Sequence, residues 1–221
     1  MVDWPLVPIS AAVLSSGEIL TWASHDVSDE TMGADSTDVV LWDPITNEFE
    51  DINNPTHDMF CSGISTLSDG SIMATGGSPT QQKTSIFNPQ TKRWTEGPFM
   101  NQPRWYGSQL TMPDNSVVAT YAKGDNNIPE VLRSDNWLEL PGATMSTLYT
   151  EERAIEAAGI TNAVGPQWYA NIQVAPNGQI FHAGPTRTMH WMSVEDQGVL
   201  CLLYTSPSPR DATLSRMPSS A

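Results

Sequence analysis

The sequence has few cysteines, few basic residues and no long apolar stretch. Only two of its 221 residues are cysteines, Cys61 and Cys201, and no redox motif surrounds Cys61. Lys and Arg number 10 against 25 Asp and Glu, giving a formal net charge of -15. Binding to a nucleic-acid backbone needs surface Lys and Arg, and crossing a bilayer needs a long apolar run. We therefore expect neither nucleic acid nor a membrane as a partner.

The two ends of the chain carry little that is typical of a folded domain. The start, "MVDWPLVPIS", lacks the basic and apolar regions of a signal peptide, as would a secreted protein whose front end is missing. From Cys201 the chain reads "CLLYTSPSPRDATLSRMPSSA", which resembles the translation of a transposon-type sequencing adaptor. We interpret residues 1–200 as the natural segment and 201–221 as non-native, extended and packed against nothing. An ordinary disordered tail is the alternative.

A repeat of two apolar strands around a polar turn organises the natural segment. It occurs as "ISAAVLSSGEILTWAS", "GISTLSDGSIMATGG", "GSQLTMPDNSVVATYA" and "NIQVAPNGQIFHAGP". Gly and Asn tolerate positive φ, which two-residue hairpins require, so these residues mark the turns. The turn residues are Gly17, Gly70, Asn115 and Gly178.

The first three repeats continue into two more strands, which indicates an all-β fold. A turn between two strands occurs in "VVLWDPITNEFED", in "TSIFNPQTKRWTEG" and, more weakly, in "PEVLRSDNWLELPG". A separate stretch, "TEERAIEAAG", predicts a short helix over 150–159. Units of four strands and about 50 residues, with "GG" after the second strand, are typical of kelch-type β-propeller blades. About four such blades do not close a ring, so we expect an incomplete propeller that belongs to a larger ring.

Three stretches carry a resemblance to a known family. "HDMFCSGISTLSDGSIMATGG", "PRWYGSQLTMPDNSVVAT" and "IFHAGPTRTMHW" resemble the galactose oxidase and glyoxal oxidase family of copper radical oxidases, from about Trp4 to Trp191. The resemblance implies that the sulfur of Cys61 is joined to the ring of Tyr106 in a thioether. It further implies that Tyr106 binds copper and carries a radical. The whole enzyme would be secreted and would oxidise a primary alcohol or aldehyde with O2, giving H2O2.

The chemistry explains why such an enzyme would need a cysteine beside a tyrosine. Oxidation of an alcohol removes two electrons, and copper accepts one of them. A phenolate at the metal can supply the other oxidising equivalent, once oxidised to a radical, if its oxidation potential is lowered, which an electron-donating sulfur substituent does. Cys61 and Tyr106 each stand just before the first strand of their blades, so the repeat register should bring them together near the propeller axis.

Each of these residues also has a purely structural interpretation. A free cysteine such as Cys61 is most often a small buried hydrophobe, and Tyr106 beside Trp105 could simply pack. The family takes its imidazole ligands and a second tyrosine from later blades. We therefore interpret three histidines as structural or rim residues, namely His57, His182 and His190, and His25 as uninformative.

Two departures from the family leave the substrate open. The fungal galactose oxidases cover the thioether with a tryptophan where this chain has Lys123 or Gly124, and hold the sugar with an arginine near the position of Gly165. The substrate could be a small-molecule alcohol, an aldehyde or a carbohydrate, and the fragment alone should be inactive because most copper ligands are missing. The alternative is a non-catalytic kelch propeller that binds carbohydrate or protein through its loops.

The interpretation of the tail can be checked on nucleic acid. If residues 201–221 are adaptor, reads trimmed of adaptor will diverge from this sequence after about Leu200. A continuous genomic clone that encodes "YTSPSPRD" would show that the segment is native.

Overall fold

The computed structural model describes residues 3–23, 36–77, 81–122, 128–145, 168–183 and 188–205. These ranges contain four antiparallel sheets of four strands each, and no helix in them is long and apolar enough to span a membrane. Several predictions from the sequence concern positions outside the described residues: the helix over 150–159, His25, Lys123, Gly124 and Gly165.

Blades one and two are four-stranded meanders in which each strand pairs with the next along the chain. Blade one consists of β1 (Ser10–Val13), β2 (Ile19–Trp22), β3 (Val39–Asp43) and β4 (Glu48–Asp51). Blade two consists of β5 (Gly63–Thr66), β6 (Ile72–Thr75), β7 (Thr84–Asn88) and β8 (Arg93–Glu96).

Blades three and four repeat this order. Blade three consists of β9 (Ser108–Thr111), β10 (Val117–Thr120), β11 (Glu130–Arg133) and β12 (Asn136–Glu139), followed by the short 3-10 helix η1 (Pro141–Ala143). Blade four consists of β13 (Ile172–Val174), β14 (Ile180–His182), β15 (Thr188–Ser193) and β16 (Val199–Thr205).

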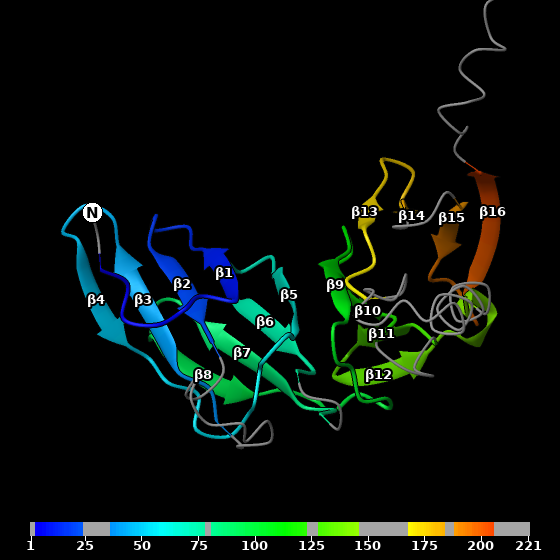
Figure 1. Cartoon of the computed structure of the whole chain (residues 1–221). Coiled ribbons are helices and arrows are strands. Elements are labelled where there is room, and N and C mark those ends of the chain that lie inside the picture. Colours follow the sequence, from blue (N-terminus) through cyan, green and yellow to red (C-terminus); the bar gives the residue numbers. More distant parts are fainter. Residues whose placement is uncertain are drawn as a thin grey trace, which may run out of the picture.

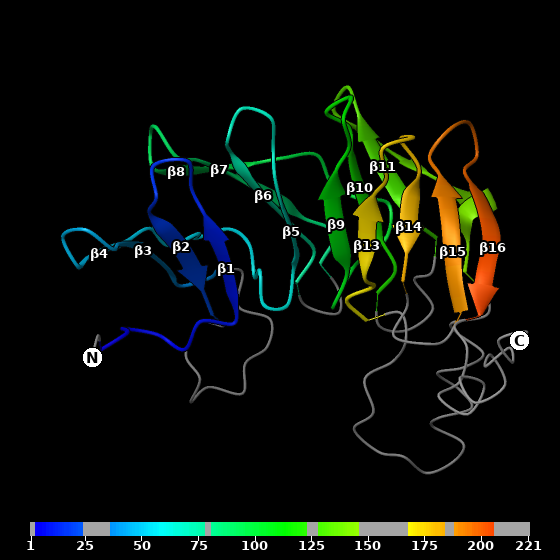
Figure 2. The same cartoon turned by 90° about the horizontal axis from the view of Figure 1, so that it is seen from above.

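The four sheets stand side by side in an open arc (Figure 1). The first strands, β1, β5, β9 and β13, line its inner side, and the fourth strands lie on the outer side. Figure 2 shows the same row of sheets from above. The predicted fold, an all-β incomplete propeller of four four-stranded blades, is confirmed.

The hairpin at the start of each blade has a three-residue loop. In blade one, the Leu14 N–H donates to the Glu18 carbonyl and the Gly17 N–H to the Leu14 carbonyl, at 2.9 and 3.0 Å. The equivalent residues all have positive φ, between 68° and 91°, at Gly17, Gly70, Asn115 and Gly178. Positive φ at these positions is therefore confirmed, but the predicted two-residue loops are wrong. A type I turn followed by one left-handed residue closes these hairpins.

The hydrophobic core lies between the blades. Leu20 and Trp22 of blade one pack with Phe87 of blade two. Similar clusters join blade two to blade three, and blade three to blade four through residues such as Val118 and Ile180. Each fully buried side chain of this kind stabilises the fold by about 1.5–3 kcal/mol. A sheet needs a neighbour on its apolar face, so the blades stabilise one another.

The pair Gly76–Gly77, just after β6, passes close to two other segments. The Gly77 N–H donates to the Arg104 carbonyl at 2.8 Å, and the Gly76 carbonyl lies 2.6 Å from Nε2 of His57. Both glycines have positive φ, and a Cβ on Gly76 would overlap the Arg104 carbonyl, while one on Gly77 would overlap that of Asp58. Only glycine lets these backbones approach so closely.

The expectation that the segment from Cys201 packs against nothing is wrong for its first five residues. Strand β16 continues through this boundary and pairs with β15, with Cys201 opposite Trp191 and Leu202 opposite His190. The side chains of Cys201 and Leu202 are nevertheless exposed. Pairing here uses backbone groups, which any sequence with strand propensity supplies.

Replacing Gly76 should cost more stability than replacing a glycine with equal backbone strain but free space. Gly178→Ala imposes left-handed strain alone, with nothing within 4 Å of the added Cβ, and should lower the free energy of unfolding by about 1–2 kcal/mol. Gly76→Ala adds the overlap with Arg104 and should cost about 1–3 kcal/mol more. Denaturant unfolding of both variants would measure this, and equal losses would contradict the close approach.

Candidate functional site

Three short segments that lead into the first strands of blades two, three and four have the same backbone turn. We call residues 57–62, 104–107 and 168–171 the lead segments. In each of them an aromatic residue precedes one with left-handed φ: 61° at Cys61, 60° at Tyr106 and 48° at Tyr169. Such angles are uncommon outside glycine and often accompany functional sites. The repeat therefore places these three side chains at equivalent positions.

Backbone hydrogen bonds connect the three lead segments directly. The Tyr106 N–H donates to the Cys61 carbonyl at 3.1 Å, and the Tyr169 N–H donates to the Tyr106 carbonyl at 2.7 Å. Each bond joins equivalent residues of neighbouring blades. The spacing of the three side chains is therefore set by the packing of the blades.

A buried ion pair anchors the lead segment of blade three. Nη2 of Arg104 lies 2.8 Å from Oε1 of Glu130 on β11, and both side chains are almost fully buried. The Glu130 carboxylate also accepts bonds from the backbone N–H groups of Asn101 and Gln102. A buried pair of this kind is strongly destabilising to break, because one charge would remain unpaired.

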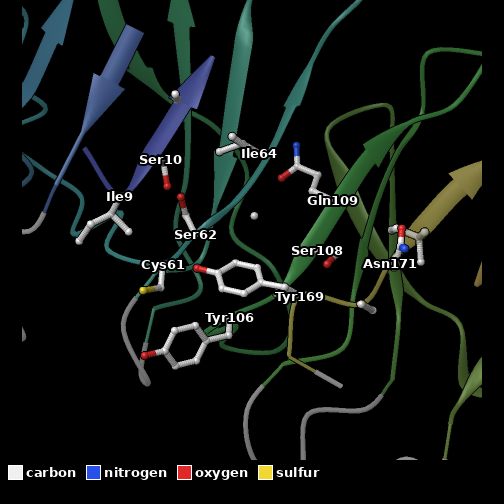
Figure 3. Close-up of a pocket in the computed structure, with 15 residues that line it drawn as sticks. Ile9, Ser10, Cys61, Ser62, Ile64, Tyr106, Ser108, Gln109, Tyr169 and Asn171 are labelled. Atoms are coloured by element: carbon white, nitrogen blue, oxygen red, sulfur yellow. The ribbon is translucent and has the colours of Figure 1, made fainter. Parts of the chain in front are cut away.

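The lead segments open onto a pocket of about 660 Å³ on the inner side of the arc. The first strands of all four blades contribute to its wall, as Figure 3 shows. Its lining residues are 9–11, 61–64, 106–109 and 169–172. The pocket thus sits where the axis-facing ends of the blades meet.

Cys61 and Tyr106 meet in this pocket, as the repeat register predicts. Cys61 lines this pocket together with Tyr169 and Tyr106, and Figure 3 shows its sulfur near the hydroxyl ends of both rings. Burial raises the pKa of the Cys61 thiol, and the nearby side chains of Tyr169 and Tyr106 act in the opposite direction. Burial also raises the pKa of Tyr106, and the nearby Cys61 raises it further. Without a metal, both groups are therefore protonated at neutral pH.

The Tyr106 ring is surrounded by other aromatic rings. It stacks on Trp105 at 4.6 Å and 25°, and on Trp168 at 4.9 Å and 11°. Tyr169 meets it edge-on, at 5.4 Å and 77°. Sequence reasoning missed Trp168 and Tyr169. The signal that could have revealed them is the dipeptide "WY", which occurs at 105–106 before β9 and again at 168–169 before β13.

The three described histidines lie away from the pocket wall, as the structural interpretation expects. His57 is buried and its ring lies 2.9 Å from the Ser85 hydroxyl and 2.6 Å from the Gly76 carbonyl. His182 and His190 are opposite each other on β14 and β15, with ring centroids 5.7 Å apart. All three therefore support the packing of the blades.

Tyr106 is the described side chain that fits a copper site. Its phenol faces an open pocket beside a thiol, and imidazole and phenolate groups suit copper. No group of three or more His, Cys, Asp or Glu side chains that could enclose a metal occurs in the described ranges. Within these ranges, Tyr106 beside the Cys61 sulfur is therefore the candidate for a copper ligand.

Known proteins that are similar to this chain include two fungal oxidases. The chain is 30% identical over 209 residues to galactose oxidase of Gibberella zeae. The aligned region covers 89% of this chain and 29% of that protein. It also resembles a solved copper-bound fungal alcohol oxidase of the AA5 family, with a TM-score of 0.78, 26% identity, and coverage of 92% of this chain and 43% of the other. No protein-family model matches the chain.

The four blades form an incomplete β-propeller of the galactose oxidase-like fold. The chain is a homologue of galactose oxidase, related to the copper radical oxidases as its motifs predict. It spans about 29% of the length of the curated relatives it matches.

His182 should make the fold sensitive to acid. Burial, and then the nearby His190, lowers the pKa of His182 to about 4. The unfolded chain binds a proton near pH 6.5, so this contribution to stability is complete above pH 6.5 and is lost as the pH falls towards 4. We expect a loss of about 3 kcal/mol over this range.

His182→Gln removes the titrating group, so its stability should fall less steeply between pH 6.5 and 4 than that of the unchanged protein. Urea unfolding at several pH values measures both slopes. Identical slopes would contradict the assignment to His182.

Proposed function

We propose that this chain carries the Cys61–Tyr106 half of a copper radical oxidase. The complete enzyme would oxidise a primary alcohol or aldehyde with O2 and release H2O2. The contact between the Cys61 sulfur and the Tyr106 phenol, in a pocket at the inner ends of the blades, is the observation that supports this most strongly. The similarity to galactose oxidase and to a copper-bound alcohol oxidase points the same way.

The residues divide the chemistry between them. Copper, when bound, exchanges one electron between its two common oxidation states. Tyr106 would hold one ligand position and, in its oxidised radical form, would accept the second electron from the substrate. A thioether to Cys61 lowers the oxidation potential of the Tyr106 ring, because sulfur donates electron density to it. The stacked Trp105 and Trp168 shield this ring from water.

In the complete enzyme, the remaining copper ligands would come from later blades. In the family that the motifs resemble, these blades supply the imidazoles and a second tyrosine. The four blades by themselves would then be inactive. The complete protein would be exported, and its substrate would be a small alcohol, aldehyde or carbohydrate. The pocket of about 660 Å³ has room for such a molecule.

Cys61→Ser and Tyr106→Phe test the two roles separately. In the complete protein, prepared without copper and then given Cu(II) in air, the unchanged sequence should yield a branched peptide that has lost two hydrogens. Cys61→Ser should abolish the branch and reduce peroxide formation while copper still binds. Tyr106→Phe should abolish the branch and also weaken copper binding by about tenfold or more, since a ligand is lost.

Peptide mass spectrometry, copper titration and a peroxide assay provide the measurements. Trp94→Phe on β8, far from the pocket lining, serves as a control that should keep the branch. Two separate peptides in the copper-loaded protein, and no peroxide with any alcohol or aldehyde, would contradict the oxidase. The non-catalytic propeller that binds carbohydrate or protein would then be the better account.

A further inference from the structure

Tyr169 has no role in the oxidase chemistry described above, yet it occupies the site. It stands in blade four where Tyr106 stands in blade three, with the same left-handed backbone. Its ring meets that of Tyr106 edge-on, and Figure 3 shows its hydroxyl near the Cys61 sulfur. Figure 3 shows the ring of Tyr169 extending across the pocket wall to Cys61.

Backbone hydrogen bonds at Tyr169 and two residues after it fix the position of Tyr169. Its N–H is bonded to the Tyr106 carbonyl at 2.7 Å, and the next residue, Ala170, is buried. One residue further on, the Asn171 carbonyl accepts a bond from the Ala183 N–H, which holds the start of β13 against the end of β14. Tyr169 is 47% exposed and lines the pocket, next to Cys61.

The Tyr169 hydroxyl, in addition to that of Tyr106, can fix the direction of the Cys61 side chain. A cysteine side chain has three staggered positions about χ1. In the observed one, the sulfur lies near the hydroxyl ends of both Tyr169 and Tyr106 (Figure 3). A thioether requires the sulfur to lie beside the ring carbon next to the Tyr106 hydroxyl. The Tyr169 hydroxyl adds a second contact that favours the observed position over the other two.

We propose that Tyr169 is a positioning residue that holds the Cys61 sulfur against the Tyr106 ring while the thioether forms. This inference rests on the proposed function. In the step, the S–H bond of Cys61 and the ring C–H bond of Tyr106 break, and a C–S bond forms. Two electrons and two protons pass to dioxygen, which becomes hydrogen peroxide. Tyr169 keeps its hydroxyl and is not consumed.

Tyr169→Phe tests the inference because it removes the hydroxyl and keeps the ring. The complete protein is prepared without copper, Cu(II) is added in air, and the branched Cys61–Tyr106 peptide is measured over time by mass spectrometry. We expect the initial rate to fall about fivefold, which corresponds to about 1 kcal/mol, the usual net value of one hydrogen bond. The melting temperature should stay unchanged, since the ring is half-exposed.

Tyr121→Phe is the matched control. It removes a buried hydroxyl that donates to the Ala143 carbonyl at 3.2 Å, away from the pocket lining, so it should lower the melting temperature and leave the rate unchanged. A wild-type rate in Tyr169→Phe, or a branch on Tyr169 in the unchanged protein, would overturn the positioning role alone. A complete absence of the branch from the unchanged protein would overturn the proposed function as well.

Discussion

The hydrogen bond from the Tyr106 amide to the Cys61 carbonyl is the contact on which the site depends. It joins equivalent left-handed residues at the inner ends of blades two and three. A second bond of the same kind adds Tyr169 of blade four. Side chains that are 45 and 63 residues apart in sequence order are thereby brought into one cluster by a local geometry repeated once per blade.

Other features of the fold keep this contact in place. The Gly76–Gly77 pair passes against the backbones of both Asp58 and Arg104, so it connects the lead segments that carry Cys61 and Tyr106. The buried Arg104–Glu130 pair ties the second of these segments to β11. Apolar packing between the sheets sets the distance between blades. The pocket is therefore a consequence of blade packing, and its chemistry depends on which residue each repeat places in the left-handed position.

Much of this architecture could be predicted from the sequence, because the repeat is regular. Alternating strands and positive-φ residues such as Gly17 and Asn115 marked every hairpin, and the motif register placed Cys61 beside Tyr106. The loop length was wrong, since a glycine fits both two-residue and three-residue turns. Trp168 and Tyr169 were missed because they follow a long insertion that hides the repeat, and stacking on Tyr106 is visible only in three dimensions. The pairing of β16 across residue 201 was equally hidden, because it uses the backbone alone.

The central claim is that the fold itself, before any metal binds, places the Cys61 sulfur against the Tyr106 ring. An electron-density map of the copper-free protein at high resolution tests this most directly. The account predicts left-handed backbones at both residues and the sulfur in contact with the ring carbon next to the Tyr106 hydroxyl. A map in which the Cys61 side chain points away from the pocket, with the Tyr106 ring packed elsewhere, would contradict it.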